Sequence, residues 1–451
     1  MGRTGVAKAE IRGPKRRLFF SNVARFRNNP LNFLSNCREV GNPLVQVDDN
    51  VYLVIDPDLV EAVFHDKDNR FVKSLPANPS SQMVSFPASV MNSSGEDWYR
   101  KRQFLQPAFH RRQVDRRVTE TFAVAERHLD QWRSNPGPCD IRRRLQPLCL
   151  DAGCQYLLGT RFNEDERSLI IALADAIIHK TRDQKRCRLW PFDRTEARLA
   201  AARKGARGVI DTIVARTRSS SEDDDWLLSK VTEGQAEPSD WLHDEFAAMI
   251  LSGLEPMADA LAWTLYLLAG HSGTLDRVVA EIDGANKADL MSAAGLAGMA
   301  QTRAAVKEAL RLFPPAWLTG RIVAKDTQLG GFDLPEGAAL MISPWVNHRD
   351  ARHFDTPDQY EADRWLDGTL ERRLPRYAFF PFGGGARRCI GEHFAMINMV
   401  AILTCLLGRF ALREVQGNDV RPFPALVLRP LGIRMILTPR ADIAGAKRRR
   451  S

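Results

Sequence analysis

The chain has 451 residues, of which 44% are hydrophobic, a composition typical of a globular protein with a sizeable core. Its 64 Lys and Arg outnumber its 55 Asp and Glu, giving a net charge of +9 that favours acidic partners. The N-terminus shows no secretory h-region and no apolar run of membrane-spanning length, and the basic residues gather in two terminal tails. We therefore expect a monomeric cytoplasmic protein with no membrane span and no nucleic acid as partner.

The predicted elements are mostly helical. Residues 42–64 predict two short strands, a turn at Asp49-Asn50 and a helix from Asp56. Helical periodicity then dominates from Asp97 to Leu312, interrupted by a polar loop at 218–225. Short strands follow Pro314, and a last long helix begins after Gly391. This order predicts a mainly α fold with a small β part: a basic segment at 1–39, one domain at 40–438 and a basic tail at 439–451.

One predicted helix carries an unusual pair of residues. MILSGLEPMADALAWTLYLLAG, residues 249–270, is apolar on every face and is therefore predicted to be buried. Glu255 is costly to bury unpaired, and Pro256 costs a helix interior about 3 kcal/mol. Pro256 also lacks the N–H that the carbonyl of Ser252 needs, which leaves that carbonyl free for water or a substrate hydroxyl. Asp259, one turn later, is expected to make a structural hydrogen bond.

The strongest chemical signal is the stretch FFPFGGGARRCIGEHFAMINMV, residues 379–400. Its three glycines, 383–385, allow the backbone to approach a ligand closely. Arg387, Arg388 and the start of the following helix favour the thiolate form of Cys389, which is a soft metal ligand. A phosphate loop is excluded because GxxxxGK[ST] is absent, and the dinucleotide pattern fails at Arg388. A nucleophilic cysteine with His393 as its base is the weaker alternative.

The same stretch resembles the haem-binding signature of the cytochrome P-450 family, FxxGxRxCxG. The matching residues are Phe382, Gly385, Arg387, Cys389 and Gly391. The resemblance implies a P-450 fold in which haem b, an iron protoporphyrin, lies between a long central distal helix and the proximal cysteine loop and helix. It also implies that the cysteine is the axial ligand of the iron.

Other matches extend the resemblance over residues 40–438. The family's Glu-x-x-Arg pair matches Glu308 and Arg311, and Arg364 is expected to complete a buried, hydrogen-bonded triad that serves folding. The resemblance further implies contacts with the haem propionates, for which the candidates are Trp98, Arg102, Arg321 and Arg387.

The family's distal helix usually carries a small residue, Gly, any residue, an acid and then Thr. Here Ser252, Gly253 and Glu255 match that pattern, and Pro256 replaces the threonine. In the family the acid and the alcohol help to deliver protons. We therefore predict that Glu255 relays protons, and that water or a substrate hydroxyl at the Ser252 carbonyl replaces the missing alcohol.

By resemblance, the protein is a monooxygenase that takes dioxygen and two electrons from a ferredoxin or flavodoxin and its reductase. The substrate is expected to be a hydrophobic small molecule such as a terpenoid, a polyketide or a fatty acid. The residues in the family's substrate-contact regions are Met83, Phe86, Trp317 and Leu426. Two alternatives remain: an atypical member (substrate-assisted, peroxide-driven, radical-coupling or rearranging), supported by the lost threonine, and a haem-binding protein without turnover.

Overall fold

A computed structural model describes residues 12–14, 22–73, 86–183, 195–219 and 240–441. Met83 and most of the polar loop predicted at 218–225 lie outside these residues. The chain divides into two compact units. The first comprises Met1–Met83, Ala316–Gln359 and Thr369–Cys389, and the second comprises Val84–Pro315, Tyr360–Gly368 and Ile390–Ser451. The predicted boundaries of one domain at 40–438 between two basic segments stay predictions.

The first unit contains the larger sheet. Its strands are β1 (Leu44–Asp48), β2 (Val51–Val54), β3 (Phe71–Val72), β5 (Thr319–Val323), β6 (Thr327–Leu329), β7 (Phe332–Leu334) and β8 (Ala339–Ile342). Its helices are α1 (Asn22–Asn28), α2 (Pro30–Arg38), α3 (Pro57–Phe64), α16 (Pro344–Asn347) and α17 (Thr369–Arg373). Five strands pair in the order β1-β2-β8-β5-β3, with β2 and β8 parallel, and β6 pairs with β7.

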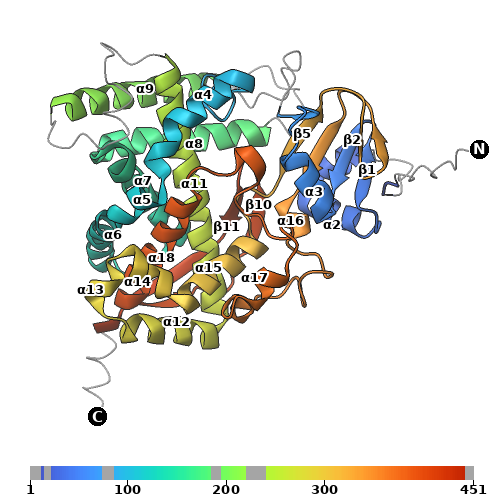
Figure 1. Ribbon diagram of the computed structural model, residues 1–451. Helices are drawn as coiled ribbons and strands as arrows, with labels where there is room; N and C mark the ends of the chain where they lie inside the picture. Colours follow the sequence, from blue (N-terminus) through green and yellow to red (C-terminus); the bar gives the residue numbers. More distant parts are fainter. Residues whose placement is uncertain (1–11, 15–21, 74–85, 184–194, 220–239, 442–451) are drawn as a thin grey trace, which may run out of the picture. The chain divides into compact units, whose positions relative to one another are not determined.

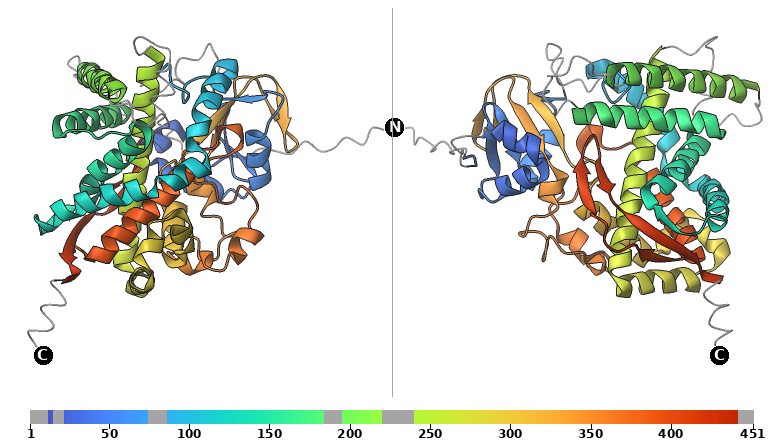
Figure 2. Two further views of the ribbon diagram at one scale, coloured as in Figure 1. Left: turned by 60° about the vertical axis from the view of Figure 1, so that its left-hand side comes forward. Right: turned by 180° about the vertical axis from the view of Figure 1, so that it is seen from behind.

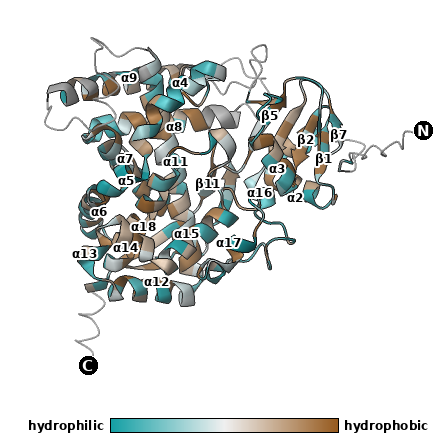
Figure 3. Cartoon of the chain, viewed as in Figure 1, coloured by the Kyte–Doolittle hydropathy of each residue, from teal (hydrophilic) through white to brown (hydrophobic). Residues whose placement is uncertain are grey.

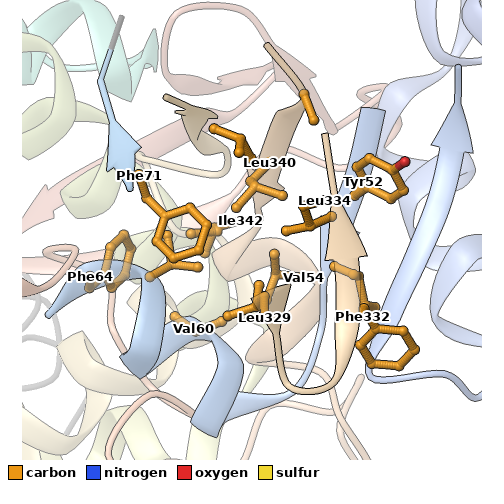
Figure 4. Close-up of a cluster of buried hydrophobic side chains, with 14 of the residues drawn as sticks. Tyr52, Val54, Val60, Phe64, Phe71, Leu329, Phe332, Leu334, Leu340 and Ile342 are labelled. Carbon is orange, nitrogen blue, oxygen red and sulfur yellow. The ribbon is translucent and has the colours of Figure 1, made fainter. Parts of the chain in front are cut away.

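The strands and helix predicted at 42–64 are confirmed. Asn50 takes a φ of 54° in the turn between β1 and β2, and the Asp56 side chain caps α3 by accepting from the amide of Asp58. The core of this unit lies between α3 and the sheet, where Phe64, Leu340 and Ile342 pack together (Figure 4). Phe64, the last residue of α3, is also the neighbour of the cysteine loop.

The second unit is mostly helical. Its longer helices are α4 (Gly95–Leu105), α6 (Val118–Arg133), α7 (Ile141–Leu158), α8 (Glu164–Asp183), α9 (Thr195–Ser219), α11 (Asp240–Gly270), α12 (Ser272–Gly284), α15 (Ala300–Leu312) and α18 (Glu392–Arg409). Its short helices are α5 (Arg111–Arg116), α13 (Lys287–Leu290) and α14 (Ala293–Gly298), with 3-10 turns at Gln106–Phe109 and Ala362–Trp365. Its strands are β4 (Pro138–Asp140), β9 (Phe410–Glu414), β10 (Arg421–Pro424), β11 (Leu428–Leu431) and β12 (Arg434–Pro439).

The helix α11 is the centre of the second unit. It packs against α7, α15, α18 and the strand β11, and Figures 1 and 2 show it running the length of this unit. Pro256 lies inside it without ending it. The helix α18 is also largely hydrophobic, is mostly brown in Figure 3, and begins at Glu392 as predicted. None of the described helices is both long enough and apolar enough to cross a membrane. The prediction of a mainly α protein with a small β part is confirmed.

Candidate active site

The cysteine loop belongs to the first unit and is packed tightly against it. Gly385 has a φ of +63°, and a Cβ there would lie 1.9 Å from the carbonyl oxygen of Phe64. A Cβ on Gly384 would lie 2.2 Å from the ring of Tyr377, whose hydroxyl accepts from the Gly385 amide at 3.1 Å. The loop closes where the Cys389 amide donates to the carbonyl of Phe382 at 2.9 Å. Gly384 and Gly385 are therefore required by packing within the protein, whereas Gly383 has a φ of +71° and no close neighbour.

Cys389 differs from the other described cysteines. It is exposed, whereas Cys139 is half-buried and the remaining four, Cys37, Cys149, Cys154 and Cys405, are buried. Burial raises the pKa of Cys37 and of Cys405 to about 12, and it also raises the pKa of Cys139, Cys149 and Cys154. Those five thiols are therefore held in the protonated form, which binds metal poorly. Among the described cysteines, the position of Cys389 best fits an iron-ligating thiolate.

Three cations gather in the same unit. Burial and, to a smaller extent, the neighbouring charges of Arg387 and Arg321 together lower the pKa of Lys73 to about 8. Arg321 is partly buried, lies over the ring of Phe64 at 5.2 Å and donates to the carbonyl of Gly320 at 2.8 Å. Like charges held together favour an anion between them. The two propionate carboxylates of haem would fit this set of cations, and Lys73 is one that the sequence analysis did not name as a candidate.

We expect the change to Ala of Arg321, Arg387, Arg102 or Lys73 to weaken haem retention. Each loses a charge-assisted hydrogen bond, worth on the order of 1.5–3 kcal/mol. The rate of haem transfer to an excess of apo-globin measures the effect. Arg352→Ala is the control, because Asp350 binds that exposed arginine at 2.6 Å. Transfer rates equal to that of the control would contradict the assignment.

The other predicted haem contacts belong to the second unit. Trp98 and Arg102 lie one turn apart on α4, and both are half-buried. Gly391 forms the N-cap of α18, as its place before the last long helix predicts. His393, the alternative base, makes a 2.7 Å hydrogen bond with Asp115. Contact of Trp98 and Arg102 with propionates stays a prediction.

The buried acid of α11 is held by three side chains. Arg142 and Arg429 both donate to Oε2 of Glu255, Arg429 at 2.5 Å, and Gln146 donates to Oε1 at 2.6 Å. Arg142 and Gln146 are four residues apart on α7, so they lie on one helical face opposite Glu255. The negative charge of this buried carboxylate is thus compensated by two guanidinium groups.

Asp259 lies one turn after Glu255, fully buried, and accepts from Nε of Arg142 at 2.6 Å. The structural hydrogen bond predicted for it is confirmed. Burial raises the pKa of Asp259, the charge of Glu255 adds to this shift, and the charge of Arg142 opposes it, with a net shift upward. The two acids therefore compete for the same guanidinium, and Glu255 has a second cation in Arg429.

The remaining predicted catalytic positions follow one another on α11. Ser252 is exposed, and its hydroxyl donates to the carbonyl of Met249 at 3.2 Å. A Cβ on Gly253 would meet nothing within 4 Å, so the helix surface is open there. Pro256 is half-buried. These positions are compatible with a small hydrogen-bonding partner at the Ser252 carbonyl, which stays a prediction.

The described substrate candidates differ in exposure. Leu426 is 42% exposed at the turn between β10 and β11, whereas Phe86 and Trp317 are buried. The segment after Phe86 is fixed to α11, because the amides of Ala88 and Val90 donate to Asp244 at 2.9 Å and to Glu245 at 2.6 Å. Burial raises the pKa of Glu245 to about 7, and the Val90 amide opposes that shift. Contact of these residues with substrate stays a prediction.

The predicted folding triad is confirmed. Arg311 donates to both oxygens of Glu308, at 2.7 and 2.9 Å, and Arg364 donates to one of them at 3.2 Å. Both Glu308 and Arg311 are 0% exposed. The indole N–H of Trp365 and the amide of Glu361 also donate to Glu308, at 2.8 and 3.0 Å. These five hydrogen bonds satisfy a charge that would otherwise be buried without compensation.

The sequence analysis missed Lys73, the buried cation near Arg321 and Arg387, and the three side chains that hold Glu255. Lys73, Arg142, Gln146 and Arg429 lie far from Glu255 or Cys389 in sequence and belong to no motif that we recognised. Two acids four residues apart on an apolar helix do signal that buried cations must face them. That signal does not show which of the 64 Lys and Arg residues are the partners, here Arg142 and Arg429.

Comparison with known proteins gives one family. The sequence model described as "Cytochrome P450" (cytochrome P-450) matches residues 11–437. The crystal structure of the cytochrome P-450DA haem domain superposes with a TM-score of 0.81 at 22% identity, covering 95% of this chain and 97% of that one. This likeness shows the fold.

Relatives from Streptomyces are similar over most of the chain. Cyclooctatin synthase of Streptomyces melanosporofaciens is 30% identical over 366 residues, covering 78% of each chain. Cyclooctat-9-en-7-ol 5-monooxygenase of the same organism is 29% identical and covers 87% of each. Pentalenene oxygenase of Streptomyces avermitilis is 29% identical, covering 76% of this chain and 78% of the relative.

Proposed function

Because the chain belongs to the cytochrome P-450 family, we propose that it is a haem-dependent monooxygenase of a hydrophobic small molecule. The observation that carries this proposal is the cysteine loop. It presents Cys389 as the exposed one among the described cysteines, in the same unit as the cations Lys73, Arg321 and Arg387. A protein that only stored or sensed haem would not need the acid cluster on α11 as well.

The chain's residues have separate tasks in this proposal. Haem b supplies the site at which dioxygen is activated, and the Cys389 thiolate is its protein ligand. Arg321, Arg387 and Lys73, with Trp98 and Arg102, neutralise and orient its propionates. The Glu255 carboxylate relays protons from a fixed position, because three side chains donate hydrogen bonds to it. Electrons come from a separate ferredoxin or flavodoxin with its reductase.

Among the substrate classes that we considered, cyclic terpenoids are favoured. The names of two relatives include the compound that is oxygenated, an alkenol in one and an alkene in the other. The chain's described substrate candidates are the apolar side chains Phe86, Trp317 and Leu426. None of these three side chains carries a charge that would bind the carboxylate of a fatty acid.

The test uses purified full-length holoenzyme with a ferredoxin, its reductase and NADPH. Cyclic terpene alkenes and alcohols, a fatty acid and a macrolide are compared for product formation under labelled dioxygen. We expect label in the product of a terpene, with NADPH consumed. Product formed only with peroxide would support the peroxide-driven alternative. Absence of turnover with tight haem binding would support a haem-binding protein.

The second candidate function is an atypical oxidation, and Pro256 favours it. A proline cannot donate a hydrogen bond from its side chain or its backbone, so this position does not supply the family's alcohol. We propose that water or a substrate hydroxyl at the Ser252 carbonyl takes its place, and that Glu255 supplies the proton. A substrate that carries a hydroxyl would then assist its own oxidation.

Two substitutions test separately whether Glu255 supplies the proton and whether a bound hydroxyl replaces the missing threonine. We expect Glu255→Gln to lower product formation per haem by about 10²-fold, the usual effect of losing a general acid. Pro256→Thr is expected to change product formed per NADPH little, because a partner already occupies that place. Asp259→Asn is the matched control, since it also loosens Arg142 but removes no proposed proton donor. Full activity of Glu255→Gln would remove the acid from the route; a large gain in Pro256→Thr would show that nothing replaces the threonine.

A further inference from the structure

Arg429 connects three separate segments of the second unit. It lies on β11, and its side chain is only 12% exposed. Nη2 donates to Oε2 of Glu255 on α11 at 2.5 Å, and Nη1 lies 3.4 Å from Oδ1 of Asp175 on α8. The guanidinium group of Arg429 thus binds Glu255, the proposed proton-relay acid, although Arg429 and Glu255 are 174 positions apart in the sequence.

The strand that carries Arg429 forms a small hairpin with an exposed tip. Strands β10 and β11 pair antiparallel with Phe423 opposite Arg429, and they form a two-stranded sheet. An isolated hairpin of two strands is marginally stable, so it depends on contacts outside itself. Leu426, the exposed residue in its turn, is three positions from Arg429, or about 10 Å of extended chain.

Backbone contacts fix the hairpin beside the arginine. Leu428 is fully buried, its amide donates to the carbonyl of Pro315 at 2.9 Å, and its carbonyl accepts from the indole N–H of Trp263 at 3.4 Å. Trp263 lies two turns after Glu255 on α11 and stacks on Phe313 at 3.8 Å. Figure 2 (right) shows β10 and β11 beside α11. The hairpin is therefore attached to α11 at both Leu428 and Arg429.

Arg429 and Arg142 are not equivalent partners of Glu255. Arg142 also binds Asp259, so without Arg429 two buried acids would share one guanidinium. Arg142 comes from the long helix α7, whereas Arg429 comes from β11 of the two-stranded hairpin. The ion pair with Arg429 therefore stabilises both the charge of Glu255 and the position of the hairpin.

We propose that Arg429 is a positioning residue that holds the Glu255 carboxylate and the β10–β11 hairpin in one arrangement. This inference rests on the proposed role of Glu255 as the proton relay. A substrate that contacts the hairpin tip thereby changes the orientation of the Glu255 carboxylate. In turn, the state of that carboxylate changes the position of the tip. Substrate fit and proton delivery are linked through one guanidinium group.

The first test is hydrogen exchange of the substrate-free holoenzyme, followed by mass spectrometry of peptides from 421–431. Arg429→Gln and Glu255→Gln should each raise exchange there on the order of tenfold, because each breaks the same ion pair. The double variant should exchange no faster than either single one. Arg421→Gln is the control, since Arg421 is exposed on the same hairpin and pairs with Asp419. Unchanged exchange in Glu255→Gln, or additive effects, would overturn the proposal.

The second test measures product formed per NADPH consumed with a terpenoid substrate. Arg429→Gln should lower it severalfold in the native background and not at all in the Glu255→Gln background, while Arg429→Lys, which keeps the charge, should recover part of it. An equal loss in both backgrounds would show that Arg429 does not act through the acid. Full coupling in Glu255→Gln would contradict the proton-relay function, and the exchange experiment would still decide whether Arg429 ties the hairpin to the acid.

Discussion

Cys389→Ser is expected to abolish the thiolate-type spectrum of the reduced carbonyl complex and to eliminate monooxygenase turnover. A serine hydroxyl is a hard, weakly acidic ligand that does not replace a thiolate on iron. The loop itself should persist, because its closing hydrogen bond joins the backbone amide of residue 389 to the Phe382 carbonyl. The measurement is the absorbance spectrum of the purified, dithionite-reduced protein under carbon monoxide.

The matched control for this result is Cys139→Ser. Cys139 is half-buried, its thiol donates to the carbonyl of Met435 at 3.4 Å, and burial raises its pKa, so it is unsuited to binding metal. This variant should keep the thiolate-type spectrum. Survival of that spectrum in Cys389→Ser, or its loss in Cys139→Ser, would contradict the assignment of the axial ligand.

Arg311→Leu is expected to cost about 3–5 kcal/mol of the free energy of unfolding, because it leaves Glu308 buried with part of its charge uncompensated. That loss is a large fraction of the stability of most domains, so little folded holoprotein should accumulate. The midpoint of urea denaturation, followed by haem absorbance and by tryptophan fluorescence, measures the change.

Two further variants separate the ion pair from simple packing. Arg364→Leu should cost less, because the Arg364 side chain is 9% exposed and its hydrogen bond to Glu308 is 3.2 Å long, whereas the fully buried Arg311 donates to Glu308 at 2.7 and 2.9 Å. Glu308→Leu combined with Arg311→Leu should cost less than the sum of the two single changes, since it leaves no unpaired member of the pair. Strict additivity would show that Glu308 and Arg311 act independently.

The cysteine loop could be predicted from the sequence because its parts are local. Arg387, Cys389 and the helix start after Gly391 lie within a few residues, which predicts a thiolate beside a helix start, and the resemblance of Phe382, Gly385, Arg387, Cys389 and Gly391 to the family's signature implies that this thiolate is the haem ligand. The strands at 42–54, the helix from Asp56 and the end of α15 before Pro314 were likewise predicted from turn, cap and proline signals. In each case the interaction that determines the structure joins residues close in the chain.

The partners of the buried acids were decided by the tertiary structure. The sequence shows that Glu255 and Asp259 need compensation inside an apolar helix, but it does not show that α7 supplies Arg142 and that a hairpin near the end of the chain supplies Arg429. A buried charge specifies only the chemistry of its partner, since a guanidinium from any segment satisfies it equally. Which segment brings that group within hydrogen-bonding distance depends on how helices and strands pack, and that packing minimises the free energy of the whole chain rather than of any one motif.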